Sequence, residues 1–199
     1  LAGCGKTLFS PIISALDRVE LPTYSYEIEH YCSLYFLQKL SLQSASTLVR
    51  MQTDLKLYNT MMGREVNFRP TDLSSVQMFH SPTQYFERLF QSGDEAIPDV
   101  INKKNPILNL IIHNILFISD PIWNALGSRC IYIEVIRHPL YMVRQQHLNM
   151  QKLIDDVRDF IIYYERGGKS YPYWTEGWED LFDQSSDIER SVHYIDQMT

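Results

Sequence analysis

The stretch Ile107-Leu108-Asn109-Leu110-Ile111-Ile112-His113 decides the fold that the sequence predicts. It is short and mostly apolar, which is typical of a strand buried on both faces of a sheet. Residues 130–136 (CIYIEVI) are rich in β-branched side chains and predict a second strand. A helix start follows each run, at Asp120-Pro121 and at Pro139. Strands that alternate with helices indicate an α/β protein with a parallel sheet.

Apolar residues at helical spacing predict most of the remaining structure. Helices are expected at residues 8–16, 25–40, 44–62, 81–93, 120–127, 139–164 and 187–198. Residues 64–79 are expected to be extended and residues 94–105 to form a loop. The side chains expected to face inward are Leu8, Phe9, Ile12, Ile13 and Leu16; Ile28, Cys32, Tyr35, Phe36 and Leu40; Leu48, Met51, Leu55, Tyr58 and Met62; Tyr85, Phe86, Leu89 and Phe90; Leu153, Val157, Phe160, Ile161 and Tyr164; and Ile188, Val192 and Ile195.

Length and composition favour one globular domain over residues 1–199. The chain is 45% apolar, 21% charged and 13% aromatic, which excludes disorder, collagen and coiled coil. The expected fold class is a helix-rich α/β three-layer sandwich around a central parallel sheet. Because the chain opens within a Gly-rich loop, its first strand is expected to precede Leu1, and a further C-terminal segment is also expected.

Charge and cysteine content limit the classes of partner. The net charge is -6, which argues against a basic nucleic-acid-binding surface. Residues 1–150 hold 13 basic and 13 acidic residues, whereas residues 151–199 hold 5 and 11, so an anionic ligand is expected in the first part. Three dispersed cysteines predict neither a disulfide framework nor a zinc site. The apolar stretch 107–118 is too short and too polar to span a membrane.

Three strand ends carry the residues that point to chemistry, because ligands of open parallel sheets bind beyond the carboxyl ends of the strands. Gly3-Cys4-Gly5-Lys6-Thr7 forms a loop whose small residues expose backbone amides at a helix start, which suits phosphate. His113 ends the strand predicted at residues 107–113, and Arg137 follows the run 130–136. Taken singly, each has an ordinary structural explanation: a tight turn, a hydrogen-bonded histidine and an ion pair.

Lys6-Thr7-Leu8 on a glycine loop, His113 at a strand end and Ile131-Tyr-Ile-Glu-Val-Ile-Arg-His-Pro139 together resemble the sulfotransferases that use 3′-phosphoadenosine 5′-phosphosulfate (PAPS). The resemblance implies a P-loop-like sulfotransferase fold and covers residues 1–16 and 107–145. It implies a loop that binds the 5′-phosphosulfate, an Arg for the 3′-phosphate, and a catalytic base at His113, 24 residues before Arg137.

The resemblance assigns His113 and Lys6 as catalytic residues. It assigns donor binding to Gly3, Cys4, Gly5, Lys6, Thr7, Leu8, Arg137 and Gln145, with PAPS as co-substrate and no metal. Two positions depart from the family pattern. Gly3 stands where the loop usually carries a basic residue, and Gln145 stands where a serine usually follows the 3′-phosphate arginine by eight positions. The Gln145 amide can still donate to phosphate.

The expected reaction moves a sulfuryl group to a hydroxyl or amine of a small-molecule or carbohydrate acceptor. Tyr173, Trp174 and Trp178 are candidates for a sugar platform or for an apolar anchor of the tail. A P-loop kinase is one alternative, although no acidic strand end offers a magnesium ligand. A non-catalytic module is the other. The cytoplasm is the expected compartment, or the Golgi lumen for a eukaryotic carbohydrate-modifying member.

Overall fold

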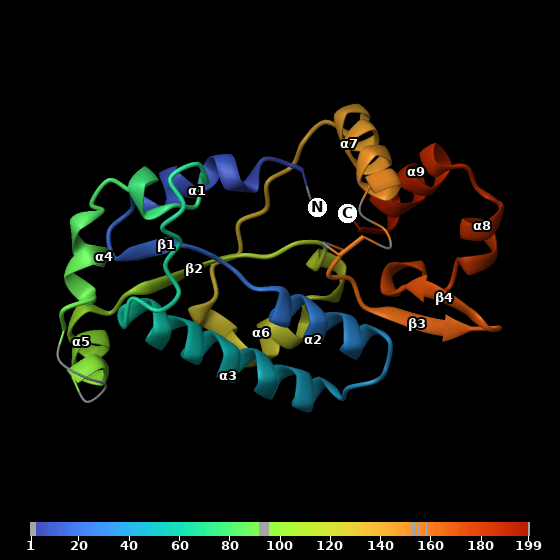
Figure 1. Cartoon of the computed structure of the whole chain (residues 1–199). Coiled ribbons are helices and arrows are strands. Elements are labelled where there is room, and N and C mark those ends of the chain that lie inside the picture. Colours follow the sequence, from blue (N-terminus) through green and yellow to red (C-terminus); the bar gives the residue numbers. More distant parts are fainter. Residues whose placement is uncertain (1–2, 92–95, 153, 155, 158, 199) are drawn as a thin grey trace. The chain divides into compact units, whose positions relative to one another are not determined.

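The computed structural model of the chain describes all residues except 1–2, 92–95, 153, 155, 158 and 199 (Figure 1). The chain forms two compact units. Residues 6–25 and 50–111 make up one, which we call the sheet unit. Residues 1–5, 26–49 and 112–199 make up the other, the helical unit. The predicted α/β class is confirmed, with many helices and a small parallel sheet.

Two parallel strands form the centre of the sheet unit. β1 (Val19–Tyr24) pairs with β2 (Ile107–Ile111), with Thr23 opposite Leu110 and Tyr24 opposite Ile111. Helix α1 (Lys6–Ser14) packs along one side of this pair (Figure 1). The sequence predicted β2 but not β1, because the six residues Val-Glu-Leu-Pro-Thr-Tyr lack a period-two pattern and contain a proline.

α1 presents its serines to the sheet, so the predicted inward face was wrong. Ser10 and Ser14 are buried, whereas Leu8 is 68% exposed and Ile12 lies on the same outer side. Ser14 Oγ donates to the carbonyl of Glu20 at 3.1 Å and accepts a hydrogen bond from the Asn109 amide, also at 3.1 Å. These bonds fix the rotation of the helix, and apolar periodicity alone does not report them. Phe9 and Leu16 are exposed for the same reason.

The core of the sheet unit is small and lies where β1 meets the segment after Gly63. Its buried members are Leu21, Val76, Phe79 and Tyr85, and Val66 packs against them. A short 3-10 helix, η1 (Val76–Met78), interrupts the predicted extended segment. Helix α4 (Thr83–Arg88) follows, but Phe86, Leu89 and Phe90 are exposed instead of inward. The predicted helix end at Gly93 lies outside the described residues.

A helix replaces most of the loop predicted for residues 94–105. α5 (Ile97–Lys104) begins with Pro98 in its first turn and ends at Asn105, which has a positive φ of 45°. Both features are ordinary helix-end signals. The loop prediction missed them because the helix has only eight residues.

Helix α3 (Leu42–Met61) was predicted, but with the wrong buried face. Val49, Thr53, Lys56 and Thr60 are buried with Ala45, whereas the predicted Met51 and Leu55 are exposed. Lys56 can occupy this face because its Nζ lies 3.1 Å from Glu65 Oε2. The predicted end at Gly63 is confirmed, with a positive φ of 75° and a hydrogen bond from the Arg64 amide to the Asn59 carbonyl.

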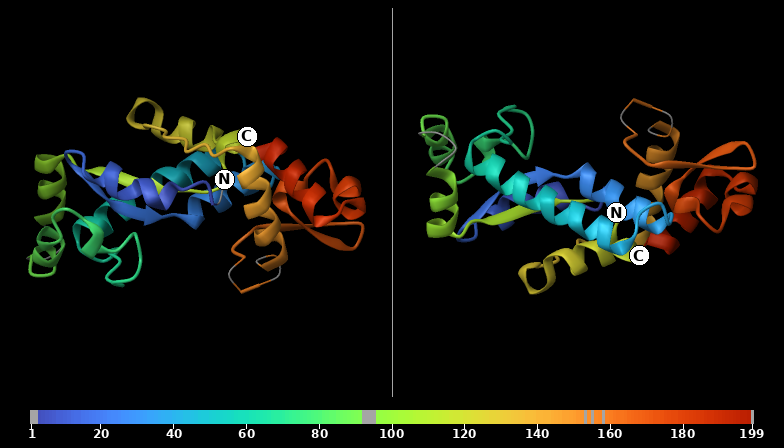
Figure 2. Two further views of the ribbon diagram at one scale, coloured as in Figure 1. Left: turned by 90° about the horizontal axis from the view of Figure 1, so that it is seen from above. Right: turned by 90° about the horizontal axis from the view of Figure 1, so that it is seen from below.

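The helical unit contains the remaining elements. They are α2 (Tyr26–Phe36), η3 (Leu116–Ile118), α6 (Asp120–Leu126), η4 (Gly127–Arg129), α7 (Pro139–Lys152), β3 (Tyr163–Arg166), β4 (Lys169–Pro172), η5 (Tyr173–Thr175), α8 (Glu179–Gln184) and α9 (Asp187–Met198). α7 packs against α9, and β3 and β4 form an antiparallel hairpin (Figure 2). The predictions of α6 and α9 are confirmed, and that of α2 is confirmed except that the helix ends at Phe36 instead of residue 40.

Two predictions for the helical unit are wrong. Residues 130–136 form no strand, and Ile131 and Ile136 are 80% and 79% exposed. β-branched side chains favour extended backbone, but a strand also needs a hydrogen-bonded neighbour, and no described segment supplies one here. The helix predicted to reach Tyr164 ends at Lys152, with Val157 92% exposed and Tyr164 in β3. Leu153 lies outside the described residues.

Aromatic side chains anchor the acidic tail. Tyr173 and Trp174 are buried, and Trp174 contacts Tyr194 of α9 with ring centroids 4.8 Å apart. This burial fits the anchor interpretation and not an exposed sugar platform. The buried residues of α9 are Ser191, Tyr194 and Met198 instead of the predicted Ile188 and Val192. Within the described part of the chain, no helix is long and apolar enough to cross a membrane.

Candidate functional site

Three of the predicted donor-binding residues meet in the helical unit. Gly3 has a positive φ of 76°, and a methyl group placed on it would lie 2.3 Å from Cγ of Gln145. Arg137 Nη1 donates to the Gly3 carbonyl at 3.3 Å. Glycine is required here both for the backbone conformation and for the close approach of α7. The loop, the segment before α7 and α7 itself therefore converge on one place.

Arg137 and Gln145 present hydrogen-bond donors at this place. The Arg137 guanidinium is exposed and lies 5.3 Å from the centroid of the Tyr141 ring. Its planar fork is suited to two oxygens of one phosphate. Gln145 Nε2 donates to Asn149 Oδ1 at 3.1 Å, and Asn149 Nδ2 donates to Gln146 Oε1 at 3.3 Å. A chain of amides thus runs along α7 from the Gly3 loop.

The other residues of the predicted loop do not all belong to the same unit. Cys4 is buried and Gly5 has a positive φ of 108°, both in the helical unit. Lys6, Thr7 and Leu8 belong to the sheet unit, where they form the first turn of α1. Thr7 Oγ1 lies 3.0 Å from the Tyr24 hydroxyl, and Leu8 is exposed. Lys6 is half-buried.

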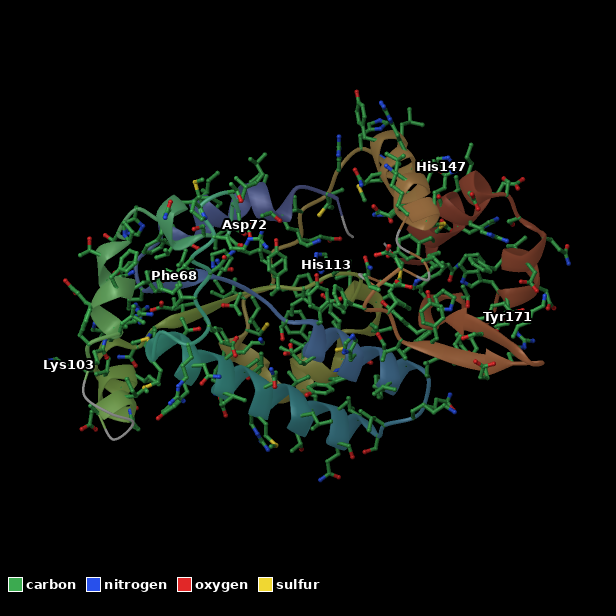
Figure 3. The ribbon with its side chains drawn as sticks, in the orientation of Figure 1. Phe68, Asp72, Lys103, His113, His147 and Tyr171 are labelled. Carbon is green, nitrogen blue, oxygen red and sulfur yellow. The ribbon has the colours of Figure 1, made fainter. Side chains whose placement is uncertain are left out.

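His113 lies two residues beyond β2 (Figure 3). It is held by Glu29 of α2. His113 Nδ1 is 2.9 Å from Glu29 Oε1, and the backbone amide of His113 donates to the same oxygen at 2.7 Å. Both side chains are largely buried. The sequence predicted His113 as a functional residue but gave no signal for Glu29, because a glutamate within a helix usually faces solvent.

A pocket of about 240 Å³ lies beside His113 and Glu29. Four aromatic residues line it, namely Tyr26, Phe160, Trp174 and Tyr194. Polar side chains complete the wall, among them Asn114, Gln146, Asn149 and Asp159. An apolar pocket with a few polar groups is typical of a site for a small organic molecule. Gln146 and Asn149 belong to both this wall and the amide chain that begins at Gln145.

Asn114, which lines this pocket, has a buried acceptor without a partner among the described residues. Its backbone has a positive φ of 51°, and its carbonyl accepts a hydrogen bond from the Tyr173 hydroxyl at 2.9 Å. Its Oδ1 is buried and has no hydrogen-bond partner in the part of the chain that the structure describes. A buried acceptor without a partner costs free energy unless a bound molecule supplies a donor.

Among the described residues, no three His, Cys, Asp or Glu side chains are grouped as metal ligands would be. The nearby Cys32 thiol is buried, and its pKa is raised to about 12 by that burial and by the charges of Glu29 and Asp120. It therefore stays protonated and is not a thiolate ligand or nucleophile at neutral pH.

Comparisons with protein-family models, with curated proteins and with solved structures gave no match for this chain.

Proposed function

We propose that this chain is a PAPS-dependent sulfotransferase with the three-layer, P-loop-like fold of that family, and that it transfers a sulfuryl group to a hydroxyl or amine of a small-molecule or carbohydrate acceptor. The observation that carries the proposal is the convergence of Gly3, Arg137 and Gln145. The resemblance assigns all three to donor binding, although Gly3 stands more than 130 positions before Arg137 and Gln145 in the sequence.

The donor end of the site would recognise the 3′-phosphate. Arg137 supplies a bidentate donor, and the Gln145 amide supplies another beside it. Charge-assisted hydrogen bonds of this kind contribute about 1.5–3 kcal/mol each. The amides of the Gly3 loop would bind the 5′-phosphosulfate, and Lys6 would balance the charge that develops on the leaving phosphate.

The acceptor end would be the pocket beside His113. In the proposed reaction, the acceptor oxygen forms a bond to the sulfur as the bond from sulfur to the 5′-phosphate oxygen breaks. His113 takes the hydroxyl proton, and the products are a sulfate ester and 3′,5′-ADP. Asn114 Oδ1 would accept a hydrogen bond from a second donor group of the acceptor. Transfer of the proton by a positioned base contributes about 10²- to 10⁴-fold to the rate.

Ligand-dependent thermal unfolding tests the proposal against its alternatives. A ligand that binds only the folded state raises its stability, by about 2.7 kcal/mol at one hundred times the Kd. We expect 3′,5′-ADP to raise the unfolding temperature in the presence of a metal chelator. Stabilisation by ATP with Mg²⁺ and not by 3′,5′-ADP would instead indicate a kinase. Stabilisation by neither nucleotide would indicate a non-catalytic module.

A further inference from the structure

We infer that Glu29 is a positioning residue: in the neutral form of the His113 ring it holds the proton on Nδ1, so that Nε2 carries the basic lone pair. The inference rests on the proposed function for its catalytic consequence, while the tautomer itself can be measured without any substrate. No sequence pattern marks Glu29, and it reaches His113 only through the fold.

The first support is the position of Glu29 on α2. Ile28 and Cys32 on the same helix are fully buried, and they fix the helix against the unit. The Glu29 side chain is only 14% exposed. Ser33 Oγ donates to the Glu29 carbonyl at 2.8 Å, which ties the next turn of the helix to this residue. The carboxylate is therefore delivered by a buried, rigid element.

The second support is that one carboxylate oxygen binds both the backbone and the ring of His113. Oε1 accepts from the backbone amide at 2.7 Å and lies 2.9 Å from Nδ1. A carboxylate can only accept, so Nδ1 must be the protonated ring nitrogen in this contact. In a neutral imidazole with Nδ1 protonated, Nε2 has the lone pair. The same arrangement orients the base of catalytic triads on unrelated folds.

The third support is the packing that holds the ring and the backbone. Tyr26 stacks on the His113 ring with centroids 6.0 Å apart and an angle of 17° between the planes. The Phe160 ring contacts the Tyr26 ring, with centroids 5.0 Å apart. At the next residue along the chain, the Asn114 carbonyl accepts a hydrogen bond from the Tyr173 hydroxyl. Burial raises the pKa of Tyr173 well above its usual range, so this donor keeps its proton.

Titratable groups from several elements share the pocket with His113. The carboxylates lining it are Glu29 and Asp159, and the phenols are Tyr26 and Tyr194. Burial raises the pKa of Tyr194 well above its usual range, so this phenol is uncharged at neutral pH. Glu29 is the carboxylate in hydrogen-bond contact with Nδ1.

The direct test is nitrogen-15 NMR of the histidine side chains in the full chain without ligand. At a pH where the ring is neutral, wild-type His113 should show the Nδ1-protonated form, assigned by loss of its signals in His113→Ala. Glu29→Ala should convert His113 largely to the Nε2-protonated form, which neutral histidine prefers in water. Glu29→Gln should retain the wild-type form, because an amide oxygen can still accept from Nδ1. Glu87→Ala, an exposed helical carboxylate in α4, is the matched control.

The catalytic consequence has a separate readout. Glu29→Ala should lower kcat about 100-fold with little change in the affinity for 3′,5′-ADP, and Glu29→Gln should recover much of that loss. Folding of each variant is checked by its thermal transition. Wild-type His113 with Nε2 protonated, or an unchanged tautomer in Glu29→Ala, would overturn the inference whatever the activity. An Nδ1-protonated His113 in a protein that neither binds 3′,5′-ADP nor turns over PAPS would refute the proposed function alone.

Discussion

Gly3 and Gln145 approach so closely that a methyl group on Gly3 would lie 2.3 Å from Cγ of Gln145. The glycine loop therefore packs against the Gln145 side chain of α7. Arg137 also donates a hydrogen bond to the Gly3 carbonyl. Position 3 therefore has no room for a side chain while Gln145 keeps its place.

Gly3→Ala should damage the donor site. The alanine would take an unfavourable left-handed conformation, at about 1–2 kcal/mol, and would also displace Gln145. We expect the affinity for 3′,5′-ADP to fall about tenfold, which is about 1.4 kcal/mol. Gly177→Ala is the control, because Gly177 has a similar φ of 90° and open space around it. Equal affinities in calorimetric titrations of Gly3→Ala and the wild type would contradict the assignment of this loop.

Arg88→Met should strongly destabilise the sheet unit. Arg88 Nη1 and Nη2 lie 2.8 and 2.9 Å from the two carboxylate oxygens of Glu20, which also accepts from the Tyr85 hydroxyl. All three residues are buried. Removing one partner leaves an unpaired buried charge, and we expect a loss of about 3–5 kcal/mol in urea unfolding. The exposed Arg129→Met should change stability by less than about 0.5 kcal/mol. A comparably small loss in Arg88→Met would show that the pair is not buried in solution.

Stability should fall above pH 9 because of Cys32. Burial raises the pKa of this thiol from 9.0 to about 12, so the unfolded chain loses the proton first. A raised folded pKa gives stability that is present below pH 9 and lost as the pH rises toward 12. Between pH 8 and pH 10 the loss from this group is about 1.4 kcal/mol. Urea unfolding at both pH values should therefore show a correspondingly smaller drop for Cys32→Ala.

The core variant Val49→Ala controls for the cavity that Cys32→Ala creates and should keep the wild-type pH dependence. A drop between pH 8 and pH 10 that is the same in Cys32→Ala and the wild type would exclude Cys32 as its source.

His113→Ala should separate catalysis from donor binding. With the base removed, release of 3′,5′-ADP from PAPS in the presence of an acceptor should slow at least about 100-fold. The affinity for 3′,5′-ADP should stay within about twofold of the wild type, because the proposed donor contacts come from Gly3, Arg137 and Gln145, which contact one another and not His113. His80→Ala, an exposed histidine in the sheet unit, should behave as wild type. Retained turnover in His113→Ala would remove His113 from the role of base.

Helix ends and one strand could be predicted because their signals are local. Gly63 ends α3 and Gly127 ends α6 through backbone conformations that glycine favours. β2 was evident as a short apolar run. The buried face of α1 could not be predicted, since Ser14 faces inward through hydrogen bonds with the Glu20 carbonyl and with the Asn109 amide, and Asn109 lies 95 positions further along the chain. Hydrophobic periodicity does not detect a helix face held by polar contacts.

The candidate site was also only partly predictable from the sequence. Arg137 and Gln145 could be selected through the family resemblance, and the structure brings both to Gly3. Glu29 and Asn149 could not, because their importance depends on which residues the fold places beside them. The run 130–136 shows the opposite failure, in which β-branched composition suggested a strand but the structure supplies no neighbouring strand among the described residues.

Calorimetric titration with 3′,5′-ADP and with 5′-AMP, which lacks the 3′-phosphate, tests the central claim most directly. The two ligands differ at the group that Arg137 would bind. We expect 3′,5′-ADP to bind the wild type at least about tenfold more tightly than 5′-AMP. This preference should disappear in Arg137→Ala and persist in Arg144→Ala, a neighbouring exposed arginine on α7. Equal affinity of the wild type for the two nucleotides, or no binding of 3′,5′-ADP, would contradict the account.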